Sequence, residues 1–200
     1  MKLFYSPTSP YARKCLALAI EKGLERDIGL LTVSPMANPV DLLAANPLAK
    51  VPALVLPDGR CIVDSRVICQ HIDSLSATPR LIPPDTAARL DTLTREAQAD
   101  GINDDAFLLT MEGKRPAEQR SPEWIERWVS AILRSVAFFD THVPQRDQPD
   151  LGDIALACAL GYLDLRHGAL EWRKSAPSLA GWFATISARP SLANSAPPPA

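Results

Sequence analysis

The pattern of hydrophobic and polar positions changes near residue 76. Before it, short apolar stretches of strand length alternate with amphipathic stretches of helix length. The predicted strands are 2–5, 27–33, 51–56 and 60–63. The predicted helices are 10–22, 40–45 and 64–74. This order, βαβαββα, predicts an α/β unit built on one sheet.

From residue 86 onward the apolar positions recur every three or four residues, which is the spacing of helices that bury one face. The predicted helices are 86–112, 123–142, 151–165 and 178–188. The segment 151–165 is apolar nearly all round, so we expect it at the centre of a helical bundle. Asp150 and Asp153 have the spacing of a capping box at its start, and Pro149 with Ile154 would form the hydrophobic staple.

Prolines mark the boundaries between these elements, because proline is disfavoured inside helices. The chain has 19 prolines in 200 residues, about twice the usual share. Pro79, Pro83 and Pro84 lie between two helical patterns and predict a linker. We therefore expect a first domain at 1–76, a linker at 77–85 and an all-helical domain at 86–200. The proline-rich tail after Ser195 is expected to fray or to lie extended on the surface.

Composition narrows the class of protein. The net charge is −2, with 46% hydrophobic and 22% charged residues, values typical of a folded globular protein. We expect no nucleic-acid partner, because phosphate binding needs clustered Lys and Arg. No apolar stretch approaches the roughly 20 residues that span a bilayer, and no secretion signal is visible, so we expect a cytoplasmic protein without membrane contact.

The four cysteines show no metal-ligand spacing, so we expect no metal site. In a cytoplasmic chain of this size a disulfide framework is neither needed nor kept. Cys15, Cys61, Cys69 and Cys158 are predicted to be buried or half-buried thiols that pack as small hydrophobic side chains.

Chemistry is indicated first at the junction of the first strand and the first helix. Pro10 suits the first helical position, so Ser9 lies at or next to the helix N-cap. Two interpretations are open. Ser9 either only caps the helix, or the free amides and positive helix end there bind an anion. A thiolate bound at this place would have a lowered pKa.

Two further segments carry polar groups at turns. Lys50, Val51 and Pro52 open a strand; if the Val51–Pro52 bond is cis, the Val51 backbone faces outward as an edge for an extended peptide. An ordinary trans proline at a strand start is the alternative. A helix N-cap is a complete structural explanation for Asp64 and Ser65. The pair also offers amides, a hydroxyl and one carboxylate, which could hold the carboxylate and the amino group of a ligand together.

These motifs together resemble the glutathione transferase superfamily over essentially the whole chain, in particular a bacterial YibF-like subgroup. The matching stretches are SPTSPYARK, NPLAKVPAL, DSRVICQHID, ADGINDDA and DLGDIALACALGYL. The resemblance implies a thioredoxin-like α/β N-terminal domain followed by an all-α helical bundle domain, and glutathione as co-substrate. It also implies a homodimer.

The resemblance assigns a role to each motif. Ser9 would donate a hydrogen bond to the glutathione sulfur, and Pro52 would be the cis-proline beside which the Val51 backbone pairs with the cysteinyl part. The Lys50 position belongs to the same binding segment. Asp64 and Ser65 would hold the γ-glutamyl end. Asp100 would reach the glutathione amino group across the dimer interface.

The second substrate is expected between the two domains. The residues that could line this electrophile site are Tyr11, Asn103, Asp104, Phe107 and Met111. Plain packing or solvation is the alternative for each of them. Thioredoxin-type redox proteins carry Cys-Pro-Tyr-Cys where this chain has Ser9-Pro10-Tyr11-Ala12, so no internal disulfide can cycle there.

Three functions are therefore compatible with the sequence. The first is an enzyme that activates the glutathione thiolate for attack on a small electrophile, by conjugation or by displacement of a halide. The second is a glutathione-dependent disulfide or peroxide reductase in which glutathione supplies every sulfur. The third is a non-catalytic protein that keeps the fold for binding or interaction.

Overall fold

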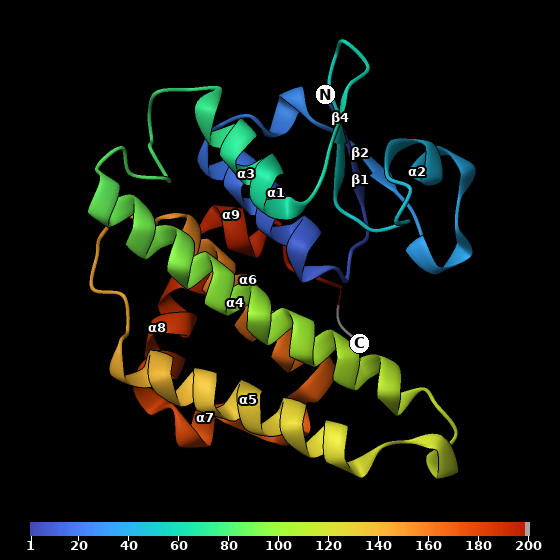
Figure 1. Cartoon of the computed structure of the whole chain (residues 1–200). Coiled ribbons are helices and arrows are strands. Elements are labelled where there is room, and N and C mark those ends of the chain that lie inside the picture. Colours follow the sequence, from blue (N-terminus) through green and yellow to red (C-terminus); the bar gives the residue numbers. More distant parts are fainter. Residues whose placement is uncertain (199–200) are drawn as a thin grey trace.

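A computed structural model of the protein describes residues 1–198 of the chain. A sheet with three helices occupies one part of the molecule, and longer helices form the other (Figure 1). Residues 75–85 connect the two parts. The domain boundaries expected at 76 and 86 stay a prediction. No helix of the described chain has the length and apolar character needed to cross a membrane.

The first part has the predicted βαβαββα order. Its strands are β1 (Lys2–Tyr5), β2 (Gly29–Thr32), β3 (Ala53–Val55) and β4 (Cys61–Ile62). Its helices are α1 (Pro10–Glu21), α2 (Val40–Ala45) and α3 (Ser65–Ser74). The strands lie in the order β2-β1-β3-β4, with β1 and β2 parallel and the other pairs antiparallel. The mixed sheet follows from the connections, since a helix joins β1 to β2 and a tight turn joins β3 to β4.

The second part is helical, as the sequence predicts. Its helices are α4 (Thr86–Gly113), α5 (Pro122–Thr141), α6 (Leu151–His167), α7 (Trp172–Ser175), α8 (Pro177–Ser187) and α9 (Pro190–Ala193). The sequence analysis missed α7 and α9, because four residues are too few to show a helical period. Proline occupies the first turn of α1, α5, α8 and α9, so several prolines do mark helix starts.

Helix α6 is the buried centre of the bundle, as predicted. Every residue from Leu151 to Leu160 is buried. The Asp150 carboxylate accepts from the Asp153 amide at 3.0 Å, and the Asp153 carboxylate accepts from the Asp150 amide at 3.1 Å. The predicted capping box is confirmed. Gly152 lets α4 approach closely, because a Cβ there would lie 2.8 Å from the Thr92 carbonyl oxygen.

The C-terminal segment returns to the first part and packs along α1. Glu21 of α1 accepts two hydrogen bonds from the Arg189 guanidinium, each 2.9 Å long. Ser195 is buried, and Pro197 lines a cleft together with Pro7 and Thr8 of the loop between β1 and α1. Beyond Ser195, residues 196–198 form no helix or strand, and Ala196 and Pro198 are exposed, which agrees with the expectation of a tail that lies extended on the surface. Pro199 lies outside the described residues.

Candidate functional site

The sheet brings three of the predicted segments to one edge. Phe4 of β1 pairs with Ala53 of β3, and Leu54 of β3 pairs with Ile62 of β4. Continuing these registers by one or two residues places Pro52 between Tyr5 and Asp64. The end of β1, the start of β3 and the end of β4 therefore meet at this edge, just where α1 and α3 begin.

Ser9 is the N-cap of α1, as predicted. Its Oγ accepts a hydrogen bond from the Ala12 amide at 3.3 Å, and Pro10 fills the first helical position. The side chain is partly exposed. Because the cap bond uses a lone pair of the oxygen, the Ser9 hydroxyl hydrogen stays available for a ligand.

A buried asparagine shapes the segment before β3. Asn46 donates from Nδ2 to the Lys50 carbonyl at 2.9 Å and accepts from the Leu48 amide at 3.1 Å. The Val51–Pro52 peptide bond is cis. Val51 precedes the paired part of β3 and is half-buried, whereas Lys50 is exposed. That the Asn46 side chain holds the Lys50–Pro52 segment was not predicted from the sequence.

Asp64 and Ser65 begin α3. Asp64 is the N-cap, and its Oδ1 accepts from the Arg66 amide at 3.0 Å. The Asp64 side chain is exposed, while Ser65 is 3% exposed. Capping occupies one carboxylate oxygen of Asp64, so its other oxygen is open to a cationic group of a ligand.

Behind these helix ends lies a buried cluster of charges that the sequence analysis missed. The Lys14 ammonium of α1 contacts Glu96 Oε1 and Asp100 Oδ2 of α4, each at 2.8 Å. Arg66 of α3 donates to Asp100 Oδ2 at 3.0 Å. Burial raises the pKa of the Glu96 carboxyl, although the adjacent Lys14 acts in the opposite direction. The cluster fixes α1, α3 and α4 relative to one another.

Asp100 belongs to this cluster within its own chain. It is 2% exposed, and its two carboxylate oxygens accept from Lys14 and Arg66. The structure thus assigns Asp100 a place behind the start of α3. Its contact with glutathione across a dimer interface stays a prediction.

The residues predicted for an electrophile site follow α4 and α1. The Tyr11 hydroxyl donates to Asp104 Oδ1, which ties the two helices together. Burial and this hydrogen bond raise the pKa of Tyr11 far above its usual value, so its hydroxyl stays protonated at neutral pH. Asn103 is 1% exposed, and its Oδ1 has no hydrogen-bond partner among residues 1–198.

On α4, Phe107 and Met111 lie one and two turns beyond Asn103. Phe107 is 38% exposed and Met111 is half-buried. The structure brings Tyr11 to Asp104, whereas the contribution of these two apolar side chains stays a prediction.

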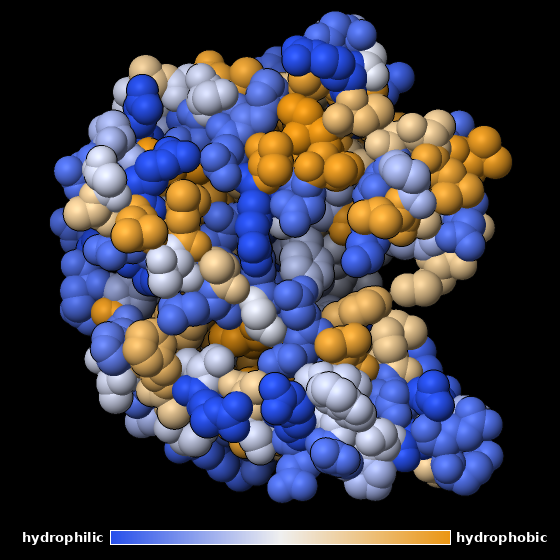
Figure 2. Space-filling model, viewed as in Figure 1, coloured by the Kyte–Doolittle hydropathy of each residue, from blue (hydrophilic) through white to orange (hydrophobic). Residues whose placement is uncertain are grey.

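A narrow cleft opens next to Ser9, between the first part and the helices. Its free volume is about 10 Å³, the space of about one water molecule. The surface is visibly hollowed between the region of α2 and the C-terminal end of α4 (Figure 2). The lining residues are Pro7, Thr8, Ser9, Pro10, Arg13, Cys158, Tyr162, Leu165 and Pro197.

Most of these lining residues were not predicted from the sequence. Arg13 follows Ser9 by one helical turn, so its place beside Ser9 could have been found from the spacing. Cys158, Tyr162 and Pro197 come from distant parts of the chain and carried no such signal.

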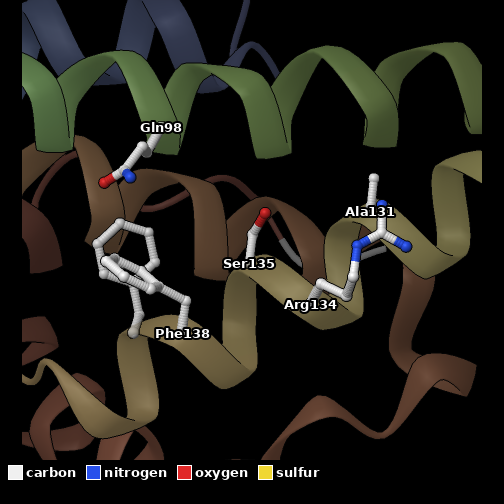
Figure 3. A pocket seen from close by; sticks show the side chains of 6 residues that line it. Gln98, Ala131, Arg134, Ser135 and Phe138 are labelled. Carbon is white, nitrogen blue, oxygen red and sulfur yellow. The ribbon is translucent and has the colours of Figure 1, made fainter.

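A larger hollow of about 210 Å³ lies between α4 and α5. Gln98 points from α4 toward the side chains of α5, among them Phe138 (Figure 3). The residues that line this hollow are Gln98, Ala131, Arg134, Ser135, Phe138 and Phe139. None of the predicted site residues lies in this hollow, so we do not place the chemistry there.

The cysteine thiols do not offer an exposed nucleophile at Ser9. Cys15, Cys69 and Cys158 are buried, and the Cys15 and Cys69 sulfurs are 3.7 Å apart. Burial raises the pKa of Cys158 to about 11. Cys61 is exposed on the edge strand β4, which corrects the expectation that it is at least half-buried. Within residues 1–198, His, Cys, Asp and Glu form no group of three suited to a metal ion.

Comparison with known proteins identifies the family. The pattern of the glutathione S-transferase N-terminal domain matches residues 8–75, and that of the C-terminal domain matches residues 122–185. An uncharacterized GST-like protein, YibF, from Escherichia coli K12 is 34% identical over 204 residues, which cover 100% of both chains. The chain belongs to the glutathione S-transferase family.

Solved structures of relatives show the same architecture with glutathione. A glutathione transferase family member from Pseudomonas fluorescens Pf-5 with bound glutathione is 39% identical, with a TM-score of 0.93 and 98% of each chain covered. A second structure from that organism contains S-(propanoic acid)-glutathione; it is 38% identical, with a TM-score of 0.91, and the match covers 99% of this chain and 100% of that one. The glutathione S-transferase fold is therefore established for this chain: a thioredoxin-like domain followed by a helical domain.

Proposed function

We propose that the protein binds glutathione and activates its thiolate for attack on a small electrophile. The observation that carries the proposal is the meeting of Ser9, the Val51–Pro52 segment and the Asp64–Ser65 helix start at one edge of the sheet. Relatives of this chain hold glutathione in the same fold, which supports the proposal.

Each segment would bind a different part of the tripeptide. The start of α3, with the exposed Asp64 carboxylate and the adjacent Ser65, suits the amino and carboxylate groups of the γ-glutamyl end. The backbone of Val51 suits the extended cysteinyl part, and the exposed Lys50 ammonium flanks that segment. This arrangement directs the glutathione sulfur toward Ser9 at the start of α1.

Ser9 then acts as a hydrogen-bond donor and not as a nucleophile. Its hydroxyl donates to the sulfur, and the positive end of α1 adds to the stabilisation of negative charge there. A hydrogen bond to a charged group contributes about 1.5–3 kcal/mol, which lowers the thiol pKa by roughly one to two units. The thiolate electron pair forms a carbon–sulfur bond, and the leaving group departs with the electrons of the broken bond.

The second substrate would bind between the two parts of the molecule. We propose that Tyr11, Asp104 and the buried amide of Asn103 present polar groups there, while Phe107 and Met111 present apolar surface. The relative that holds S-(propanoic acid)-glutathione favours conjugation, because such a compound is glutathione with a substituent on its sulfur.

We further propose that two copies of the chain form a homodimer. Phe138 lines the hollow between α4 and α5 and is exposed (Figure 3), and Met36, Val40 and Leu48 near α2 are also exposed apolar residues. Burial of such side chains against a second copy would remove them from water.

Isothermal titration with reduced and oxidised glutathione tests the proposed function. The wild type is expected to bind reduced glutathione, and Ser9→Ala is expected to raise the thiol pKa of the bound molecule. Ser121→Ala is the matched control, because Ser121 also caps a helix before a proline and accepts from the Trp124 amide at 3.4 Å. Absence of binding for both forms would contradict the proposal, and tighter binding of the oxidised form would favour the reductase.

A further inference from the structure

Among residues 1–198, Arg13 is a buried cation without an acidic partner. It is 6% exposed, its Nη2 donates to the Leu192 carbonyl at 3.0 Å, and its buried Nε has no hydrogen-bond partner among the described residues. Lys14 and Lys22, the other buried cations, each contact a carboxylate at 3.0 Å or less. A buried charge that is not compensated is costly, so the place of Arg13 calls for an explanation.

Arg13 lines the cleft beside Ser9. Arg13 follows Ser9 by four residues on α1, so the two share one face of the helix, and side chains on a helix lean toward its N-terminus. The guanidinium passes over Gly161 of α6, where a Cβ would come within 2.5 Å of Arg13 Nη1. A glycine at this position therefore gives the cation room against α6 at the cleft.

Cys158 and Tyr5, two titratable side chains near the guanidinium, carry no negative charge at neutral pH. Burial raises the pKa of Cys158 to about 11 and also raises the pKa of Tyr5 above its usual value. The N-terminus of α1 is the positive end of the helix dipole and adds to the positive charge at the cleft. Two positive features thus face one cleft, and no carboxylate of residues 1–198 forms an ion pair with Arg13.

We infer that Arg13 receives the carboxylate of a small acidic second substrate while the glutathione sulfur lies at Ser9. The inference rests on the proposed function and names its substrate class: short carboxylic acids with a leaving group on a carbon near the carboxylate. A planar guanidinium matches the geometry of a carboxylate, and Arg13 lines the cleft beside Ser9. The sulfur displaces the leaving group, and Arg13 determines specificity without changing its own bonds.

A matched pair of glutathione conjugates tests this assignment by isothermal titration. S-carboxymethyl-glutathione and S-carbamoylmethyl-glutathione differ only in a carboxylate and its neutral amide. The wild type is expected to bind the carboxylate form roughly ten times more tightly, the size of one hydrogen bond to a charged group. Iodoacetate and iodoacetamide, which give these two products, should show the same preference in kcat/KM above the uncatalysed rate.

Three variants test whether Arg13 causes the preference for the carboxylate conjugate. Arg13→Gln is expected to bring the affinity ratio of the two conjugates close to one, while its affinity for unmodified glutathione stays that of the wild type. Arg13→Lys keeps the charge and should retain part of the preference, which covers the case in which the glutamine variant does not fold. Arg89→Gln is the control, because Arg89 is exposed on α4 and should leave the ratio unchanged.

The outcomes separate this inference from the proposed function. Equal affinity of the wild type for both conjugates, with normal binding of glutathione, would overturn the acidic-substrate inference alone. A loss of affinity for unmodified glutathione in Arg13→Lys would show that Arg13 serves a carboxylate of glutathione itself. A raised thiol pKa of bound glutathione in Arg13→Gln, with an unchanged affinity ratio of the two conjugates, would show that Arg13 acts on the thiolate. Either of these two results would overturn the inference. Failure of all three molecules to bind would overturn the proposed function as well.

Discussion

Replacement of Lys14 by methionine removes the ammonium that joins α1 to α4. Lys14 contacts Glu96 and Asp100 at 2.8 Å, and the three side chains are 1–3% exposed. Asp100 keeps the Arg66 guanidinium at 3.0 Å after the change, whereas the hydrogen bonds of Glu96 recorded in the structure come from Lys14 alone. The variant therefore leaves one buried carboxylate without a cation. Loss of one partner from a buried ion pair costs about 3–5 kcal/mol.

Urea unfolding followed by far-ultraviolet circular dichroism measures this cost. Lys14→Met is expected to lower the free energy of unfolding by about 3–5 kcal/mol. Adding Glu96→Gln should restore at least about 1 kcal/mol, because the second change removes the unpaired charge. Lys174→Met is the control, since its ion pair with Glu171 is 75% and 57% exposed and contributes at most about 1 kcal/mol. A loss below about 1 kcal/mol for Lys14→Met, or no recovery in the double variant, would refute this reasoning.

Three further changes test other parts of the structure. Burial raises the pKa of Asp153 to about 6, so stability should fall as the pH rises from about 4 to 6, and Asp153→Asn should flatten this part of the pH profile in urea titrations. Asn46→Ala frees the turn before Val51 and should weaken glutathione binding several-fold by calorimetry; unchanged affinity would remove Asn46 from the site. Gly161→Ala places a Cβ 2.5 Å from Arg13 Nη1 and should cost about 1–3 kcal/mol in thermal unfolding, whereas an unchanged melting temperature would contradict that contact.

The elements with strong local signals were predictable from the sequence. Helix α6 is apolar nearly all round and has its capping box at Asp150 and Asp153, so both its existence and its burial followed from pattern. The N-cap at Ser9 followed from the proline after it. The short helix α9 had no periodic pattern, and its anchoring to Glu21 depends on side chains 168 positions apart in the sequence.

The residues of the candidate site were likewise predictable from the sequence only in part. Turn chemistry marked Ser9, Val51 and Asp64 in the sequence, because such turns need particular residues. The ion cluster of Lys14, Glu96 and Asp100 was not predictable, since buried and solvated charges look alike in a sequence. The sequence likewise does not show that Arg13 has no ion-pair partner among residues 1–198, because this depends on how α6 and the C-terminal segment pack against α1.

The central claim is that Ser9 at the start of α1 stabilises the thiolate of bound glutathione. Titration of the thiolate by its ultraviolet absorbance, in complexes with wild type, Ser9→Ala and Ser121→Ala, measures this directly. The account predicts a thiol pKa that is higher by roughly one to two units in Ser9→Ala than in the wild type, with no change in Ser121→Ala. An equal thiol pKa in all three complexes would contradict the claim.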